Sequence, residues 1–504
     1  MLSDGKPSFS FLLVISSCGG MLLALAFAFE SLAFLSLLML VPLLWVSQVG
    51  SLRSTFFWGW YIGGIAHLGT IWWVVPTLLG TENWSLSGAL LAMAFVAMAQ
   101  GFQMAVFTLG AAFAFRRTRH VALATAAWWV FIEWVFPKFL PWFLADPLIH
   151  LPFLGQGADL AGVHGLAFLL VLEQGWFTQA LRSKLNGDAQ WRPPLRSCLA
   201  VLLLMLAYGL IREYSPERER VSRLGVGIAQ SGLDLRGPDP LAESHRAFGA
   251  YERLSASPKM EAAQLVVWGE TVLRVPLGTQ VLWQQKVRRL AVQTNKAFLL
   301  GSIDRPIGQE TEYNSAYLVR ATGPAEVYRK RVLFPFFEYV PGAEYFDFAK
   351  QWPTTGLFVP GVDQGLLHFQ DARMALSICF EAMMPGGQNE AVKKGANLLV
   401  NISDDIWLGD TPAPRQHLTS VRWRAIETRR YLVRSSNSGI SAFIDPSGRL
   451  LHRLPFGTEG TASLSVPLLD GQTVYVRFGN WIGYVAVALL IALIGWPGLA
   501  KSDP

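Results

Sequence analysis

Eight long apolar runs are the feature of this sequence that most restricts its fold. A bilayer hydrocarbon core about 30 Å thick needs roughly 20 apolar helical residues to cross it. The stretch 138–159 is rich in Pro, Phe and Leu, and it is better interpreted as an interfacial or re-entrant loop than as a span. We therefore predict a multi-span α-helical membrane protein with about eight transmembrane helices, at residues 9–29, 31–49, 55–79, 87–115, 120–137, 160–181, 196–211 and 476–498.

The composition agrees with a membrane protein. Only 15% of the 504 residues are charged, whereas 52% are hydrophobic. Soluble globular proteins carry about 25% charged residues. The net charge of +6 does not indicate a nucleic-acid partner, because the Lys and Arg residues form short clusters between apolar runs. Polytopic membrane proteins distribute basic residues in this way.

The basic clusters also predict the orientation of the chain. Arg116, Arg117 and Arg119 follow the fourth span, and a second cluster at 182–196 follows the sixth. Cytoplasmic loops carry an excess of Lys and Arg, so we expect both termini in the cytoplasm and the segment 212–475 outside. Arg212, beside the seventh span, is discordant, but large domains translocate largely regardless of charge.

The segment between the seventh and eighth spans has a different pattern. Strands alternating with helices indicate a layered α/β domain with helices packed over sheets. The expected organisation is a seven-span region at 1–211, an extracytoplasmic α/β domain at 212–475, and a final span with a short tail at 476–504. The β-rich runs lie at 224–229, 265–269, 297–303, 315–320, 374–380, 397–402 and 431–445, and the helical segments include 279–295 and 413–430.

Few residues outside this domain invite a chemical interpretation. Cys18 and Cys198 lie in apolar stretches and are expected to be small buried hydrophobes. Glu133 and Glu173 lie inside predicted spans, where an ionisable group is costly and by default suggests a functional role. A partnered structural or lateral-cavity role is at least equally compatible with the sequence, so we do not assign them to the site. Eight histidines lack ligand spacing, so we expect no metal and no other cofactor.

Three positions in the α/β domain combine into a candidate catalytic set. Glu270 ends a predicted strand, Lys330 lies in a proline- and aromatic-rich loop, and Cys379 closes an apolar strand. A carboxylate can take the thiol proton, and a cation can stabilise the thiolate and a tetrahedral oxyanion. Taken alone, each residue has a simpler interpretation. Glu270 is compatible with an exposed carboxylate at a strand end, Lys330 with a solvated basic turn, and Cys379 with a cysteine that only packs in the core.

The flanking residues of this set resemble the nitrilase superfamily, whose catalytic Glu, Lys and Cys occur in this order along the chain. The second glutamate of the superfamily matches Glu338 in FPFFEYVP. The stretches NLLVNISDDIWLGDTPAPRQH (397–417) and YLVRSSNSGISAFIDPSGRL (431–450) resemble the segments that follow its cysteine. The resemblance implies a nitrilase-like αββα sandwich for the inserted domain.

A nitrilase-like domain between a seventh and an eighth span is the layout of the apolipoprotein N-acyltransferase family, and this resemblance covers nearly the whole chain. It implies that a phospholipid, typically phosphatidylethanolamine, donates an acyl group to a cysteine thioester. The acceptor would be the α-amine of an S-diacylglyceryl-cysteine apolipoprotein, at the outer face of the bacterial inner membrane. We expect the enzyme to act as a monomer in contact with membrane lipid.

The resemblance also implies roles for single residues. Glu270 would be the base and acid at Cys379, Lys330 and the N–H of Phe380 would stabilise the oxyanion, and Glu338 would support Lys330. Glu381 carries over from the glutamate two residues after the family's cysteine. The sequence departs from the family where Phe380 replaces a tyrosine, and where Asp404-Asp405-Ile406-Trp407 replaces the more usual Asn-Asp-Ala-Trp.

Three alternatives remain open from the sequence. A membrane-tethered amidase or nitrilase would use water as the second nucleophile and share the same thioester. A transporter with an outer domain would show internal repeats among its spans, and we see none. An inactive binding or scaffolding module is disfavoured by the intact set of Glu, Lys, Glu and Cys.

Overall fold

The chain divides into two compact units. The structure is a computed structural model and describes residues 7–81, 84–138, 140–215, 220–342, 345, 358–362 and 365–495. One unit comprises Met1–Ser215 with Phe478–Pro504, and the other comprises Pro216–Arg477. Residues 496–498 of the last predicted span lie outside the described residues.

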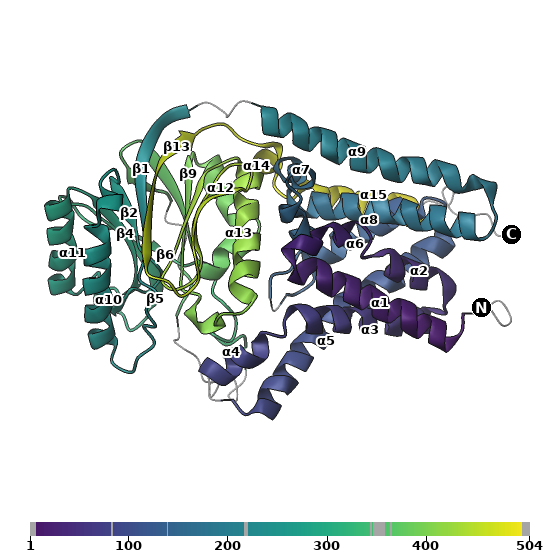
Figure 1. The fold of residues 1–504 in the computed structure, drawn as a ribbon, viewed down its shortest axis with the longest axis horizontal. Helices are drawn as coiled ribbons and strands as arrows, with labels where there is room; N and C mark the ends of the chain where they lie inside the picture. The colour runs from purple at the N-terminus through teal and green to yellow at the C-terminus, as the bar shows by residue number, and fades with distance from the viewer. Residues whose placement is uncertain are drawn as a thin grey trace. The chain divides into compact units, whose positions relative to one another are not determined.

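The first unit is a bundle of apolar helices (Figure 1). Among the described residues, five helices are long and apolar enough to cross a membrane, and a sixth candidate arises if α3 and α4, bent by 50°, form one span. The bounds are α1 Phe9–Ala28, η1 Glu30–Leu37 with α2 Val41–Val49, α3 Leu52–Thr70, α4 Val74–Thr81, α5 Leu86–Arg117, α8 Ala158–Leu185, and η3 Ala189–Trp191 with α9 Arg192–Tyr214. The prediction of a multi-span helical region is thus confirmed.

Two predicted spans are shorter apolar helices in the described part of the chain. Helices α6 (Val121–Val135) and α15 (Trp481–Gly495) have 15 residues each. At 1.5 Å per residue, the described part of each helix extends about 22 Å, which is less than the hydrocarbon thickness. Among the described residues, six of the eight predicted spans thus coincide with long apolar helices or with the bent pair, and the other two coincide with these shorter helices.

The stretch after α6 is buried and largely irregular. It contains η2 (Asp146–His150) and α7 (Pro152–Gly155). Side chains accept its backbone N–H groups: Leu140 N–H donates to Gln100 Oε1 at 2.8 Å, and Leu144 N–H donates to Glu133 Oε1 at 2.8 Å. Irregular backbone inside a membrane unit needs such internal partners. Glu133 thus has a structural contact.

The cysteines of this unit differ in exposure. Cys198 is buried, and its thiol lies 3.6 Å from the Glu173 carboxylate. Cys18 on α1 is exposed, so its expected burial is wrong. An apolar sequence does not reveal which face of a helix points away from the bundle.

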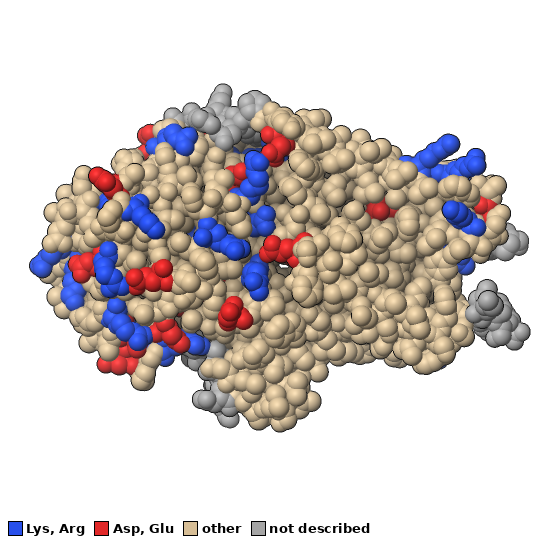
Figure 2. Space-filling view, viewed as in Figure 1, with Lys and Arg blue, Asp and Glu red and all other residues tan. Residues whose placement is uncertain are grey.

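Charge is distributed differently over the two units. Figure 2 shows many charged side chains on the visible face of the α/β unit. The visible face of the helical unit is mostly uncharged, apart from a basic cluster at the end where α8 and α9 meet. Arg182 and Lys184 in the last turn of α8 and Arg192 at the start of α9 belong to this end. The cluster lies where the sequence predicts a cytoplasmic loop.

The second unit contains two β-sheets. Within the described residues, one sheet has seven strands in the order β13-β1-β2-β4-β5-β6, with β3 paired to β4, and the other has six in the order β12-β11-β10-β9-β8-β7. The bounds are β1 Arg220–Gln230, β2 Leu265–Val267, β3 Leu273–Pro276, β4 Ala297–Asp304, β5 Tyr313–Val319, β6 Glu326–Arg329, β7 Leu367–Phe369, β8 Ala372–Ile378, β9 Leu398–Ser403, β10 Leu432–Ser436, β11 Ser441–Ile444, β12 Leu450–Leu454 and β13 Gly460–Leu469.

Helices cover both outer faces of this pair of sheets (Figure 1). Helices α10 (Pro240–Ser255) and α11 (Val281–Thr294) pack on the first sheet around Trp268 and Trp283. Helices α12 (Gly387–Lys393) and α13 (Ala413–Thr428) pack on the second. The αββα prediction is confirmed. The run 431–445 forms two antiparallel strands, β10 and β11, rather than one.

Strand direction brings several loops to one edge of the sandwich. Strands β2 and β4 are parallel, and so are β8, β9 and β10. Ser435 on β10 bridges the sheets, because its hydroxyl donates to the Val267 carbonyl oxygen at 2.9 Å. The ends of β2, β8 and β9 therefore meet, as polar residues at the carboxyl ends of strands usually do in open α/β folds.

Candidate active site

Glu270 lies just after β2 in a tightly packed turn. Its backbone N–H donates to the Ser403 carbonyl oxygen at 3.1 Å, so the turn is fixed to the end of β9. Gly301 on β4 passes close beside it, because a Cβ there would lie 2.6 Å from the Glu270 Cα. The residue is 7% exposed, and its carboxylate accepts from Asn314 Nδ2 at 2.7 Å and from the Asp404 N–H at 2.9 Å.

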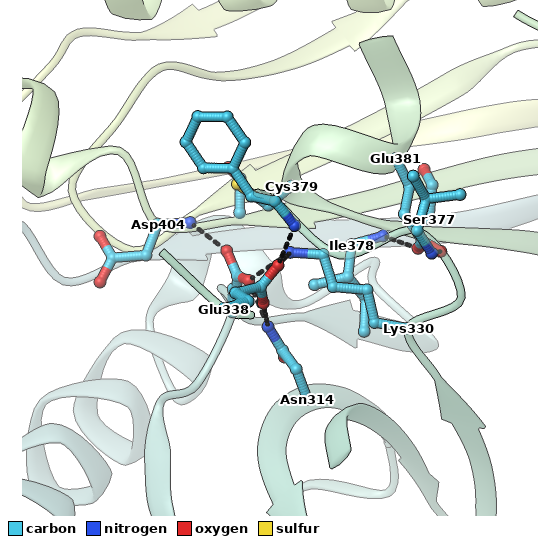
Figure 3. A network of polar contacts seen from close by, with 12 residues as sticks. Asn314, Lys330, Glu338, Ser377, Ile378, Cys379, Glu381 and Asp404 are labelled. Carbon is cyan, nitrogen blue, oxygen red and sulfur yellow. Dashed lines mark hydrogen bonds and ion pairs between the residues drawn. The ribbon is translucent and has the colours of Figure 1, made fainter. Parts of the chain in front are cut away.

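Lys330 follows β6 and lies between two carboxylates (Figure 3). Its ammonium Nζ is 2.7 Å from Glu338 Oε2 and 3.5 Å from Glu270 Oε1, and the side chain is 1% exposed. Asn314 Nδ2 also donates to Glu338, at 2.8 Å. Burial disfavours the charged lysine, yet the two carboxylates outweigh it and raise the pKa of Lys330. The buried group therefore stays an ammonium.

Cys379 begins the short helix η6 (Cys379–Met383) directly after β8. Its φ of 50° is left-handed, a conformation that costs energy for a residue with a Cβ and that clusters at functional sites. Burial raises the pKa of the Cys379 thiol well above its ordinary value; the Glu270 charge raises it further, and Lys330 opposes the shift. At rest the sulfur is a thiol, so its attack requires a base.

Glu381 ties the cysteine turn to the loop that carries Lys330. Its carboxylate accepts the Ile378 N–H at 2.8 Å and the N–H groups of Arg331 and Val332 at 2.6 and 3.0 Å. The Tyr328 hydroxyl donates to the same carboxylate at 3.1 Å. Glu381 thus fixes the position of Cys379 relative to the lysine loop.

The structure brings Glu270, Lys330 and Glu338 into direct contact, and the charges of Glu270 and Lys330 both act on the Cys379 thiol. Figure 3 shows Cys379 beside this polar network. Their catalytic roles stay a prediction. Asn314, which links Glu270 to Glu338, was not predicted from the sequence, because a single Asn on a buried strand has no distinguishing spacing.

A second polar cluster also contacts Cys379. His417 on α13 approaches the Cys379 carbonyl oxygen with Nε2 at 3.3 Å and Asp405 Oδ1 with Nδ1 at 3.0 Å. Arg434 on β10 binds the other Asp405 oxygen at 2.7 Å, and both side chains are 0% exposed. Arg434 is the sequence signal for this cluster, because an arginine inside a buried strand requires a buried acceptor.

Cys379, Asp405 and His417 are the set of possible metal ligands in the described part of the chain, with donor atoms within 4.8 Å of one another. Thiolate, carboxylate and imidazole are zinc ligands. However, the Asp405 oxygens already accept from Ser403 at 2.8 Å and from Arg434, and His417 Nδ1 lies 3.0 Å from Oδ1. The guanidinium of Arg434 would also repel a cation, so these residues fit a hydrogen-bonded cluster better than a metal site.

An aromatic cluster covers the polar site. The rings of Phe334 and Phe380 are 4.8 Å apart, and those of Phe337 and Trp407 are 4.9 Å apart. Phe334 also stacks on Phe337 at 4.9 Å. The side chains that cluster next to Cys379 are therefore apolar.

Comparison with known proteins assigns both units. Residues 19–176 match the Apolipoprotein N-acyltransferase N-terminal domain, and residues 235–474 match the Carbon-nitrogen hydrolase family. The chain is 30% identical to an apolipoprotein N-acyltransferase from Bradyrhizobium diazoefficiens over 76% of this chain and 74% of that protein. This chain belongs to the apolipoprotein N-acyltransferase family. A second relative of that name, from Geobacter metallireducens, is 28% identical over 96% of this chain and 94% of its own length.

Solved structures similar to this chain include an amidase of the nitrilase superfamily from Nesterenkonia. It is 21% identical, with a TM-score of 0.38, and the match covers 52% of this chain and 96% of that chain. Membership of the apolipoprotein N-acyltransferase family rests instead on the full-length relatives. With several apolar helices long enough to span a bilayer, the chain is a membrane protein.

The two departures from the apolipoprotein N-acyltransferase pattern have different surroundings. The ring of Phe380 packs in the aromatic cluster, where a hydroxyl is not needed for packing. Asp404 lies beside Glu270, and its Oδ2 accepts from Asn437 at 3.3 Å. Burial, together with the nearby Glu270 charge, raises the pKa of Asp404 to about 7. The second departure therefore adds a titratable group next to the expected base.

Proposed function

We propose that this chain moves a fatty acyl group from a phospholipid, through a thioester on Cys379, to the N-terminal amine of an S-diacylglyceryl-cysteine apolipoprotein. The observation that carries this proposal is the buried ammonium of Lys330 between Glu270 and Glu338, beside a buried thiol. Such a site can move a proton and stabilise an oxyanion without a cofactor.

In the first half-reaction, Glu270 takes the thiol proton as the Cys379 sulfur attacks the ester carbonyl carbon. A sulfur–carbon bond forms, the ester carbon–oxygen bond breaks, and Glu270 returns the proton to the departing oxygen. The products are the acyl-enzyme and a lysophospholipid. Burial raises the pKa of Glu270, so its carboxylate is a stronger base for the thiol proton than an exposed glutamate.

In the second half-reaction, the α-amine of the lipidated cysteine attacks the thioester carbonyl carbon. A nitrogen–carbon bond forms, the sulfur–carbon bond breaks, and Glu270 transfers a proton from the amine to the departing sulfur. The product is an amide, and the thiol is restored. Because both half-reactions pass through a tetrahedral oxyanion, one set of donors serves both.

The proposed oxyanion donors are the Lys330 ammonium and the Phe380 N–H. Removing one such donor typically slows an enzyme by about 100- to 1,000-fold. Glu338 keeps the lysine charged and oriented through its 2.7 Å ion pair. Glu381 acts as a positioning residue, because its contacts fix both the cysteine turn and the lysine loop.

The membrane unit and the aromatic cluster support lipid substrates. Each methylene group buried in a bilayer is worth about 0.8 kcal/mol, so neither double-chain substrate would leave the membrane readily. We propose that the donor is typically phosphatidylethanolamine. We also propose that the α/β unit lies on the outer face of the inner membrane, that both termini are cytoplasmic, and that the enzyme is a monomer.

Intact mass of the detergent-purified protein after exposure to phosphatidylethanolamine tests the first half-reaction. We expect an added mass of one acyl chain that is lost in Cys379→Ala and kept in Cys198→Ala, the matched buried cysteine. Unmodified wild-type protein with an intact fold would contradict the thioester mechanism.

The rival function, a membrane-tethered amidase or hydrolase, shares the thioester but uses water in the second step. Adding a synthetic S-diacylglyceryl peptide to the acyl-enzyme separates the two. Amide-linked triacyl peptide, detected by mass spectrometry, supports transfer. Free fatty acid alone, at the same rate with and without the peptide, supports hydrolysis.

A further inference from the structure

One peptide unit joins Cys379 to Phe380. His417, on the helix α13 that packs on the second sheet, contacts this peptide unit. The neighbour of His417 Nε2 is the Cys379 carbonyl oxygen, at 3.3 Å. A carbonyl oxygen is an acceptor, so Nε2 must carry a hydrogen for this contact to be favourable. His417 and Cys379 are 5% and 9% exposed, and water therefore competes little for this contact.

The planarity of the peptide bond gives this contact a consequence for the chemistry. The carbonyl of Cys379 and the N–H of Phe380 belong to one rigid plane and point in opposite directions. Fixing the direction of the carbonyl therefore fixes the direction of the N–H. That N–H lies in the first turn of η6, where a helix provides no internal acceptor.

Other contacts keep the imidazole in place. Nδ1 lies 3.0 Å from Asp405 Oδ1 and 3.3 Å from Arg434 Nη2. The Arg434 guanidinium also donates to the Ile440 carbonyl oxygen at 3.1 Å. The histidine is thus held by the second sheet, whereas Glu381 holds the preceding peptide through the Ile378 N–H.

We propose that His417 is a positioning residue that sets the oxyanion hole: through the Cys379 carbonyl it aims the Phe380 N–H at the tetrahedral intermediate. Asp405 and Arg434 act through His417. This inference rests on the proposed function, because the Phe380 N–H is an oxyanion donor only if Cys379 is the nucleophile. The left-handed φ of 50° at Cys379 is then the conformation that His417 maintains.

Two substitutions of His417 distinguish the contact made by Nε2 from the contact made by Nδ1. In His417→Gln, the side-chain amide can occupy the Nε2 position and keep the hydrogen bond to Cys379. In His417→Asn, the shorter amide can occupy the Nδ1 position and keep the contact with Asp405, but it does not reach Cys379. The exposed His452 on β12 offers a matched control, His452→Asn.

The measurement is the single-turnover rate of acyl-thioester formation with phosphatidylethanolamine, together with kcat and KM for amide formation. We expect His417→Asn to lower the acylation rate and kcat on the order of 10- to 100-fold, with KM for the phospholipid unchanged. We expect His417→Gln to stay within about threefold of the wild type, and His452→Asn to match it. A purely structural role would not distinguish Gln from Asn in this way.

Equal acylation rates for the Asn and Gln variants, whether both are slow or both are normal, would overturn the inference. If the Asn variant does not fold, His417→Gln decides: a folded Gln variant slowed by tenfold or more contradicts it. The absence of any thioester on wild-type protein would instead contradict the proposed function, so the two failures are distinguishable.

Discussion

Lys330 is the most constrained charge in the site, with Glu338 at 2.7 Å and Glu270 at 3.5 Å. We expect Lys330→Gln to reduce thioester formation by about 100- to 1,000-fold, because an oxyanion donor is removed. The variant also leaves two buried carboxylates without a cation, which typically costs about 3–5 kcal/mol. Intact mass and thermal unfolding in detergent measure the two effects. If the variant is acylated at the wild-type rate, Lys330 has only a structural role and takes no part in thioester formation.

Asp404 predicts a pH dependence of stability. Its pKa is raised by burial from an ordinary 3.8 to about 7, so the folded state favours the protonated carboxyl. The contribution of the protonated Asp404 carboxyl to the free energy of unfolding is fully present below about pH 4 and is lost as the pH rises through about 7. We expect Asp404→Asn to be about 1–3 kcal/mol more stable than the wild type above pH 7, and equally stable near pH 4. Thermal unfolding at both pH values measures this, and a variant less stable at pH 8 would contradict it.

The sequence predicts those site residues that follow a strand within a specific motif, such as Glu270 and Cys379. It does not predict Asn314, Asp405 or His417, because each is a single polar residue whose importance depends on contacts between distant segments. Arg434 was the available signal, since a buried guanidinium implies a buried carboxylate. Periodicity reveals burial, but it does not reveal which polar groups meet.

At the scale of elements, η6 is held to the end of β6 by one carboxylate. Glu381 accepts three backbone N–H groups and a tyrosine hydroxyl. In Glu381→Gln, an amide NH₂ would face one of these donors, and each unsatisfied buried group costs about 1–3 kcal/mol. We therefore expect a lower unfolding temperature and slower acylation, measured as for Lys330. Glu390→Gln, on an exposed ion pair of α12, is the matched control and should change neither.

Hydropathy and β-propensity predict which elements occur in this chain better than they predict how long each element is. The run 431–445 reads as one strand, yet the chain turns between β10 and β11 at Ser436–Gly439, where small polar residues satisfy the backbone. Likewise the apolar run of α6 continues into Phe136 and Pro137, but the helix ends at Val135 and gives way to a buried irregular segment. Side chains such as Glu133 make that ending possible, and hydropathy does not detect them.

For the whole molecule, the distribution of Lys and Arg predicts a topology. Arg116 and Arg117 end α5, and Arg182 and Lys184 end α8. Because basic loops remain in the cytoplasm, alkaline phosphatase fused after Arg119 should be inactive, whereas phosphatase fused after Asp470 should be active. The fusions are compared at equal expression in intact cells. The reverse pattern would place the catalytic residues on the cytoplasmic face and contradict the proposed substrate.

The pairing of β1 with β13 has a consequence for biosynthesis. These strands are the first and last of the α/β unit, and they pair from Arg220 with Leu469 to Gln230 with Gly460. In the proposed topology, one edge of β1 stays unpaired during export until some 230 further residues have crossed the bilayer. Folding of the α/β unit would then be completed only when β13 leaves the translocation channel, and a chain truncated before residue 460 should be a substrate for quality-control proteases.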